Sequence, residues 1–308
     1  MSFWLNSLSV GIVLGTPLAY AALGELLAER AGVMNLGVEG MMLMGAVVGF
    51  IVTLATHSPV AGFAAAIAAG AALASLHAVM TVGLRVNQIV MGLTLTILGG
   101  GLSAYIGTGY AGRRPGAGVS AIAIPGLSQI PLVGNVLFNH DVFVYAVPFV
   151  ALAIWLLLHR SRFGLWLRAA GEQPGAADAS GVPVFAIRYL AVIVGGGLAG
   201  LAGAYFSVVY TQAWAEGMTN GRGWIAIALV IFGTWDPIVV LFGALLFGFV
   251  DGLNFQLQSV GVPVSTHLLA MMPYAFTLVV LFITWTRLRH RHVGMPESLG
   301  VPYEREAR

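Results

Sequence analysis

Two polar side chains that could do chemistry lie four residues apart in a glycine-rich stretch, residues 30–45. Asn35 and Glu39 share one face if this stretch is helical, but three glycines precede Met41, and each glycine weakens a continuous helix. A carboxylate this close to an apolar run is costly to bury unless it is paired or hydrated. The stretch therefore fits a broken helix beside a solute pathway, and it fits equally well an interfacial loop with a capping glutamate.

A second candidate site is the polar segment 159–187, which is rich in arginine and small residues. It predicts two short helical pieces joined around residues 171–175, with Pro174 in the first turn of the second piece. Ala176 and Ala177 would offer a small surface against which another protein could pack. Composition alone favours a simpler interpretation, in which this loop only sets the membrane topology through its positive charge.

Other acidic residues give weaker signals. Asp251 lies inside an apolar run beside Asn254, either as a functional intramembrane carboxylate or as a hydrated group near the outer end of the run. Glu25, Glu29 and Arg30 are expected to form a charge cluster at the membrane interface.

Motifs for catalysis are missing from the sequence. It contains no cysteine and no lysine, no paired-histidine metal spacing, no serine nucleophile elbow and no phosphate-binding loop with lysine. We therefore expect no catalytic residue, no metal site and no bound cofactor, and the chain should not hydrolyse ATP by such a loop.

The elements that position these residues are long apolar helices. Of the 308 residues, 58% are hydrophobic and 8% charged, far below the charge of about 25% that soluble domains carry. A water-soluble enzyme and a disordered chain are thereby excluded, and the basic pI does not indicate a nucleic acid partner. We expect an all-α, polytopic transmembrane bundle of about nine spans, forming a single domain over residues 1–308. The apolar runs are 9–27, 37–56, 60–82, 88–107, 141–158, 186–209, 223–233, 237–257 and 266–286.

Two features refine this bundle. The run 223–233 is too short to cross about 30 Å of hydrocarbon, so it is either a half-helix or a span extended by its flanks. The segment from Gly195 to Gly203 places small residues at four-residue spacing, which predicts close helix packing.

Arginine positions orient the chain. If the segment 159–187 and the tail 287–308 are cytoplasmic and the chain crosses nine times, 11 of the 14 arginines lie inside and three lie outside. The expected topology is an external N-terminus and a cytoplasmic C-terminus.

Three blocks of sequence resemble the permeases of bacterial ABC importers. Residues 29–46 look like the family signature, residues 168–182 resemble its cytoplasmic coupling segment, and residues 221–237 resemble a third block. The nearest branch handles simple sugars and purine nucleosides, and ribose and branched-chain amino acid permeases are more distant. The resemblance covers about residues 10–286.

The resemblance implies a subunit of the bacterial cytoplasmic (inner) membrane that forms a solute pathway with a second homologous permease. A cytoplasmic ABC ATPase would bind ATP and Mg²⁺, and an extracytoplasmic binding protein would deliver the solute. Residues expected to couple to the ATPase are Arg168, Gly171, Glu172, Ala176, Ala177 and Gly181. Residues expected along the pathway are Asn35, Glu39, Met41, Asn87, Gln88 and Trp224.

Alternatives remain at this point. An ion-coupled secondary transporter of a small polar solute would need intramembrane carboxylates, for which Glu39 and Asp251 are candidates. An integral-membrane enzyme would need convergent polar groups, whereas the histidines are scattered. A purely structural subunit would leave the broken stretch 32–45 without a purpose. Among solutes, a purine nucleoside, another nucleoside and a simple sugar stay open in that order.

Overall fold

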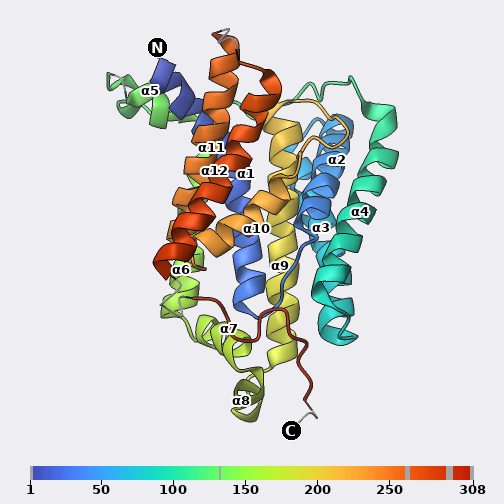
Figure 1. Ribbon diagram of the computed structural model, residues 1–308. Helices are drawn as coiled ribbons and strands as arrows, with labels where there is room; N and C mark the ends of the chain where they lie inside the picture. The colour runs from blue at the N-terminus through green and yellow to red at the C-terminus, as the bar shows by residue number, and fades with distance from the viewer. Residues whose placement is uncertain (1–2, 132, 261–263, 289–293, 306–308) are drawn as a thin grey trace.

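The computed structural model describes residues 3–131, 133–260, 264–288 and 294–305. It is a bundle of long helices with short elements at its two ends (Figure 1). The long helices are α1 (Phe3–Arg30), α2 (Val38–Thr56), α3 (Pro59–Ala78), α4 (Gln88–Gly107), α6 (Val142–Arg160), α9 (Val184–Ala204), α11 (Pro237–Ser259) and α12 (Thr266–Leu288). The short helices are α5 (Gly134–Leu137), α7 (Arg162–Glu172), α8 (Pro174–Ala179) and α10 (Arg222–Phe232). The predicted all-α membrane bundle is confirmed.

Among the residues that the structure describes, strands occur only in one small antiparallel pair. β1 (Ile122–Ala123) pairs antiparallel with β2 (Asn139–His140), so that Ile122 lies opposite His140. This pair and α5 belong to the long polar connection between α4 and α6. This connection lies at the end of the bundle that carries the N-terminus (Figure 1).

Seven of the described helices are long and apolar enough to cross a membrane, judged by length and composition. They are α1, α2, α6 and α11, together with α3, α4 and α9. The last three continue without a break into a π-helix (Val79–Gly83), a 3₁₀-helix (Thr108–Tyr110) and a π-helix (Tyr205–Tyr210), respectively. α10 has only 11 residues, and α12 forms a helix over the predicted run 266–286. The predicted number of nine spans is therefore approximate. The run 223–233, which the sequence marks as too short to span, forms the short helix α10.

Local sequence explains where many helices begin. Side chains of Ser58, Asn87, Asp141, Ser161 and Asp236 accept hydrogen bonds from backbone N–H groups in the first turns of α3, α4, α6, α7 and α11. These N-cap contacts satisfy donors that have no partner inside the helix. Proline occupies the first turn of α3, α8 and α11, where its missing N–H is not needed.

The centre of the bundle is α1, which is almost entirely buried from Leu14 to Glu29. A helix that is apolar on all sides belongs in the interior. Glycines let its neighbours approach closely: a Cβ atom on Gly24 would lie 2.5 Å from the carbonyl oxygen of Gly195 on α9. Gly45 on α2 similarly faces the backbone of Gly200 on α9. The close packing predicted for the segment 195–203 is confirmed.

The two chain ends lie at opposite ends of the bundle (Figure 1). α7, α8 and the C-terminal segment 294–305 share the lower end, as Figure 1 is drawn. Arg30 and Arg85 lie at this end too, because Arg30 contacts Gly294 and Arg85 pairs with Glu304 at 3.6 Å. This arrangement agrees with the grouping of arginines on which the predicted topology rests.

Candidate translocation and coupling sites

Two interrupted helices meet inside the bundle. Residues 31–37 are not helical, with Gly32 at a φ of +85°, and α2 begins only at Val38. α10 begins at Arg222 after a non-helical connection from α9. Glu39, in the first turn of α2, lies against the beginning of α10 and is only 6% exposed.

The Glu39 carboxylate caps α10. It accepts hydrogen bonds from Thr219 Oγ1 at 2.6 Å, from the Gly221 backbone nitrogen at 2.8 Å and from the Gly223 backbone nitrogen at 2.6 Å. The N-terminus of a helix carries unpaired N–H donors and partial positive charge, so a carboxylate is stabilised there. The stretch 30–45 is therefore interrupted before α2, and Glu39 is a capping glutamate, although for another helix. The solute pathway beside it stays a prediction.

An ion pair lies next to this cap. Arg222 Nη2 is 2.6 Å from Asp251 Oδ2 on α11, and the two side chains are 14% and 9% exposed. The Arg222 guanidinium also lies 5.1 Å from the ring centroid of Phe206, within the range of a cation–π contact. Asp251 is thus paired within the bundle. We call the cap and the pair together, Glu39, Thr219, Gly221, Gly223, Arg222 and Asp251, the polar centre.

A cavity of about 210 Å³ adjoins the polar centre. Its walls combine hydrogen-bonding groups with aromatic faces and come from the start of α10, from α11 and from α12. The lining includes Arg222, Asp251, Asn254, Gln258, Phe255 and Tyr274. Aromatic faces with a few polar groups are typical of sites that bind small organic molecules.

The other residues expected along the pathway are dispersed. Asn35 and Met41 are buried, and Asn35 closes a local turn by accepting from the Gly37 nitrogen. Since Asn35 precedes the helix, it does not share a helix face with Glu39. Gln88 is buried and accepts from the Met34 nitrogen at 2.7 Å.

Asn87 and Trp224 differ from that buried group. Asn87 is exposed, and its side chain caps α4. Trp224 follows the cap on α10 and is 37% exposed. Glu39 thus belongs to the polar centre, and Trp224 follows on α10 without lining the adjoining cavity. Asn35, Met41 and Gln88 are packed in the interior of the bundle.

The expected interfacial cluster of Glu25, Glu29 and Arg30 is different in the structure. Both carboxylates are buried within α1, at 2% and 1% exposure. Glu25 Oε1 accepts from the Asn35 nitrogen at 2.8 Å, and Glu29 Oε2 accepts from Trp235 Nε1 at 2.5 Å. Because α1 is the central helix, its acidic face meets the non-helical connections of its neighbours rather than water.

The second candidate site is the hairpin of α7 and α8, at the end of the bundle that holds the C-terminus (Figure 1). The predicted pair of short helices is confirmed, including Pro174 in the first turn of α8. Ser161 caps α7 by accepting from the Gly164 nitrogen at 2.9 Å. An open groove of about 540 Å³ lies between α7 and α8 and is lined by the hairpin and by residues up to Val182.

The groove has an apolar floor and an exposed rim. Leu165 and Trp166 on α7 are 57% and 43% exposed. Its lining residues are Leu165, Trp166, Ala169, Glu172, Gln173, Ala176, Ala177, Ser180 and Val182. An exposed tryptophan beside small residues is typical of a surface that receives another protein.

The residues expected to couple to the ATPase fall into two groups. Glu172, Ala176 and Ala177 line the groove, where Ala176 is exposed and Ala177 is 5% exposed. The other three do not line the groove. Arg168 is half-buried, Gly171 packs against the Arg30 carbonyl, and Gly181 has a φ of +84° after α8.

Sequence reasoning missed Thr219, Leu165 and Trp166. No local pattern shows that Thr219 reaches a carboxylate 180 positions away. A usable signal did exist for α7, since three large apolar residues, 165–167, stand together between arginines at 162 and 168. Within the described residues, no group of three or more His, Asp or Glu side chains is placed to hold a metal ion.

Comparison of the sequence with known proteins identifies a family. The family described as "Branched-chain amino acid transport system / permease component" matches residues 7–285. A putative glucose ABC transporter permease of Haloferax volcanii is 41% identical, over 99% of each chain. A guanosine ABC transporter permease of Bacillus subtilis, NupQ, is 32% identical over 95% of this chain and 94% of its own.

A second glucose permease of the same Haloferax strain is a more distant relative. It is 27% identical over 96% of this chain, and the match covers 79% of the relative's length. No solved structure matches the chain significantly.

Proposed function

The chain belongs to this family of ABC transporter permeases, and from that premise we propose that it carries a neutral ring-shaped solute, a nucleoside or a simple sugar, into the cell. It is a membrane-spanning permease subunit. The names of its relatives support both solute classes, since one handles glucose and another handles guanosine. We place the subunit in the cytoplasmic (inner) membrane, with its N-terminus outside and the α7–α8 hairpin inside.

We infer that the working transporter contains further subunits. The chain has no phosphate-binding loop of its own, so a separate ATPase would bind ATP and Mg²⁺ and supply the energy. An extracytoplasmic binding protein would deliver the solute. A heterodimer of permeases is supported by the Haloferax relatives, which are two different glucose permeases from one strain.

The coupling role falls to the hairpin. The observation that carries this proposal is the groove of about 540 Å³ between α7 and α8, open at one end of the bundle and rimmed by exposed Trp166 and Leu165. The ATPase would bind this surface, with Ala176 and Ala177 giving room for close approach. Arg168, Gly171, Glu172 and Gly181 would hold the hairpin so that its movement reaches the bundle. ATP must then bind the two states of the transporter with different affinity, because only a difference in affinity drives the change.

The pathway role falls to the polar centre and the cavity next to it. Sites built from interrupted helices at membrane depth are common in transporters, where groups at the breaks line the pathway. Glu39 would hold the start of α10 at this site, and Trp224 would lie beside it on α10. Asn35, Met41 and Gln88 would belong to the packing around it, with Asn87 capping α4. Hydroxyl groups of a ribose or hexose suit the amide and charged groups of the cavity, and a ring face suits Phe255 and Tyr274.

The test is to replace Ala176, the exposed alanine of the groove, by glutamate in the transporter reconstituted with its ATPase and second permease. Ala111→Glu is the matched control, because Ala111 is an exposed alanine in the connection that follows α4. We expect Ala176→Glu to abolish ATPase co-purification and solute-stimulated ATP hydrolysis, with the control unchanged. If both survive in Ala176→Glu, or if the purified chain alone moves solute uphill without ATP, the proposal is wrong. The second result would make the chain an ion-coupled secondary transporter instead.

A further inference from the structure

The C-terminal segment 294–305, which we call the strap, lies across the lower end of the bundle beside α7 (Figure 1). Besides the Arg85–Glu304 pair, three anchors join it to the rest of the chain, each at a different place. Its contacts with residues more than 100 positions earlier make it part of the same unit as α7 and α8.

The first anchor of the strap is the turn before α11. Arg30 Nη1 donates to the Gly294 carbonyl oxygen at 3.0 Å, and Arg30 Nε donates to the Trp235 carbonyl oxygen at 3.1 Å. Gly294 has a φ of +79° and packs directly against the Thr234 carbonyl group. One guanidinium therefore ties the strap to the turn that joins α10 to α11.

The middle anchor is buried. Ser298 donates to the Gly171 carbonyl oxygen from its backbone nitrogen at 3.0 Å and from its hydroxyl group at 2.6 Å. Arg188 of α9, which is only 2% exposed, donates to the Ser298 hydroxyl oxygen at 2.9 Å and to the Ala170 carbonyl oxygen at 3.1 Å. These contacts hold the end of α7, the start of α9 and the strap together.

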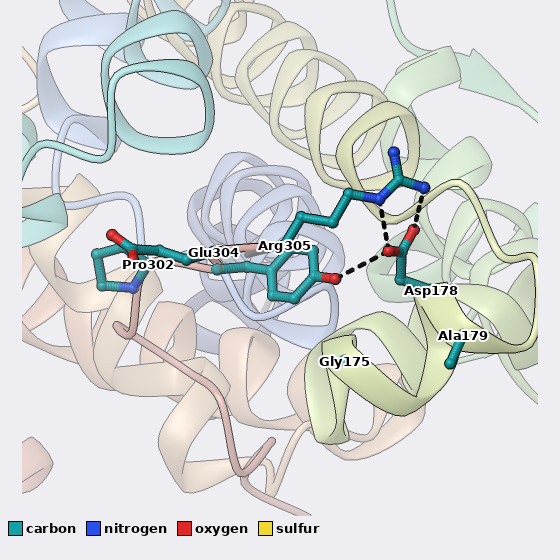
Figure 2. A pocket seen from close by; sticks show the side chains of 7 residues that line it. Gly175, Asp178, Ala179, Pro302, Glu304 and Arg305 are labelled. Carbon is teal, nitrogen blue, oxygen red and sulfur yellow. Dashed lines mark hydrogen bonds and ion pairs between the residues drawn. The ribbon is translucent and has the colours of Figure 1, made fainter. Parts of the chain in front are cut away.

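The far anchor is the Asp178 carboxylate on α8 (Figure 2). It accepts from Arg305 Nε at 2.8 Å, from Arg305 Nη2 at 3.1 Å and from the Tyr303 hydroxyl group at 3.1 Å. The Tyr303 ring lies 5.5 Å from that of Phe185 on α9, measured between centroids. A cavity of about 700 Å³ separates α8 from the strap beside these contacts.

The three anchors connect the hairpin to the polar centre. α8 is held by the far anchor, and the turn at Thr234–Trp235 by the first. α10 runs from that turn to its N-terminus, which Glu39 caps. We propose that the strap is a positioning element of the transport cycle, which passes a displacement of α8 to the turn before α11 and so to α10. This inference rests on the proposed function of the hairpin.

The far anchor offers a test by charge exchange. Asp178→Arg and Arg305→Asp each break the ion pair. The double variant restores an ion pair with the two charges exchanged. Glu297→Arg is the control, because Glu297 lies on the strap and contacts Glu172 through its backbone nitrogen. The reconstituted transporter is assayed for ATPase co-purification, basal and solute-stimulated ATP hydrolysis, and uptake.

We expect each single exchange to lower uptake and the ratio of stimulated to basal hydrolysis by about threefold, which is the scale of a partly exposed ion pair. Co-purification should stay at the wild-type level in Arg305→Asp, and the double variant should recover most of the loss. The inference is overturned if both single variants transport normally, if the double variant is no better than the worse single, or if Arg305→Asp releases the ATPase. Failure of the proposed function would differ, since the wild-type transporter would then show no ATP-dependent uptake.

Discussion

Glu39 on α2 and Gly223 on α10 are joined by a hydrogen bond of 2.6 Å from the glycine nitrogen to the glutamate carboxylate. The contact links two helices that both begin inside the bundle. Because the Glu39 carboxylate accepts three donors from the connection before α10 and from its first turn, a residue of α2 caps α10. Separating the two helices would expose unpaired groups on both sides, so the contact favours a discrete closed arrangement.

Replacing Glu39 by glutamine should weaken the cap that its carboxylate forms on α10. The amide keeps the size of the side chain but loses the charge and offers one acceptor oxygen to three donors. Hydrogen bonds to charged groups contribute about 1.5 to 3 kcal/mol each, roughly twice a neutral one. We expect a lower thermal unfolding temperature in detergent and reduced uptake. Glu216→Gln, at an exposed position, is the control, and equal behaviour of the two variants would contradict the assignment.

The Arg222–Asp251 pair should show strong coupling between its partners. Arg222→Met or Asp251→Leu alone leaves one buried charge without its partner, at a cost of about 3 to 5 kcal/mol. The double variant removes both charges and should recover most of that stability. Thermal unfolding of the four proteins in a double-mutant cycle measures the coupling. Strictly additive single effects would show that the pair does not stabilise the bundle.

The same double variant separates stability from transport. If the cavity beside the pair contacts the solute, the folded double variant should bind and transport its solute poorly, although it unfolds near the wild-type temperature. Uptake measured over a range of solute concentrations gives KM, which should be higher in the double variant if the pair helps to bind the solute. Full uptake by the double variant would show that the Arg222–Asp251 pair is not part of the solute pathway.

Gly24 should not tolerate a larger residue. A Cβ atom there would lie 2.5 Å from the Gly195 carbonyl oxygen, so Gly24→Leu forces α1 away from α9. Overpacking of a close interface typically costs about 1 to 3 kcal/mol. Gly101→Ala is the control, because no atom lies within 4 Å of the added carbon on α4. We expect poor accumulation and early unfolding of the first variant only, measured by size-exclusion chromatography and thermal unfolding.

Trp166 should be a main contact of the ATPase. Exposed tryptophans at the centre of an interface often account for a large share of the binding energy. Trp166→Ala should therefore reduce ATPase affinity about tenfold or more, while the permease itself folds normally. Trp4→Ala, at an exposed residue near the N-terminus, is the control. Retention of the ATPase at wild-type affinity would exclude Trp166 from the interface.

Much of the fold can be predicted from local sequence. The lengths of the apolar runs correspond to the long helices, the glycines of 195–203 pack as expected, and Pro174 begins α8. These features depend on neighbouring residues and on the thickness of the membrane. The short run 223–233 is likewise recognisable as an incomplete span.

Contacts between distant segments could not be predicted in this way. The partners of Glu39 lie 180 to 184 positions away, and Asp178 meets Arg305 across 127 positions. The burial of Glu25 and Glu29 also escaped local reasoning, because it follows from the central place of α1 rather than from the residues beside them. The roles of the predicted coupling and pathway residues stay predictions that the variants above would test.

The strap also orders events during synthesis. Residues 294–305 leave the ribosome after every long helix has been made, so α8 acquires its bond to Arg305 last. A nascent chain that stalls before this point has a hairpin without its Ser298 and Arg305 anchors. The α7–α8 hairpin therefore reaches its final packing only once residues 294–305 have been added, later than any helix of the bundle.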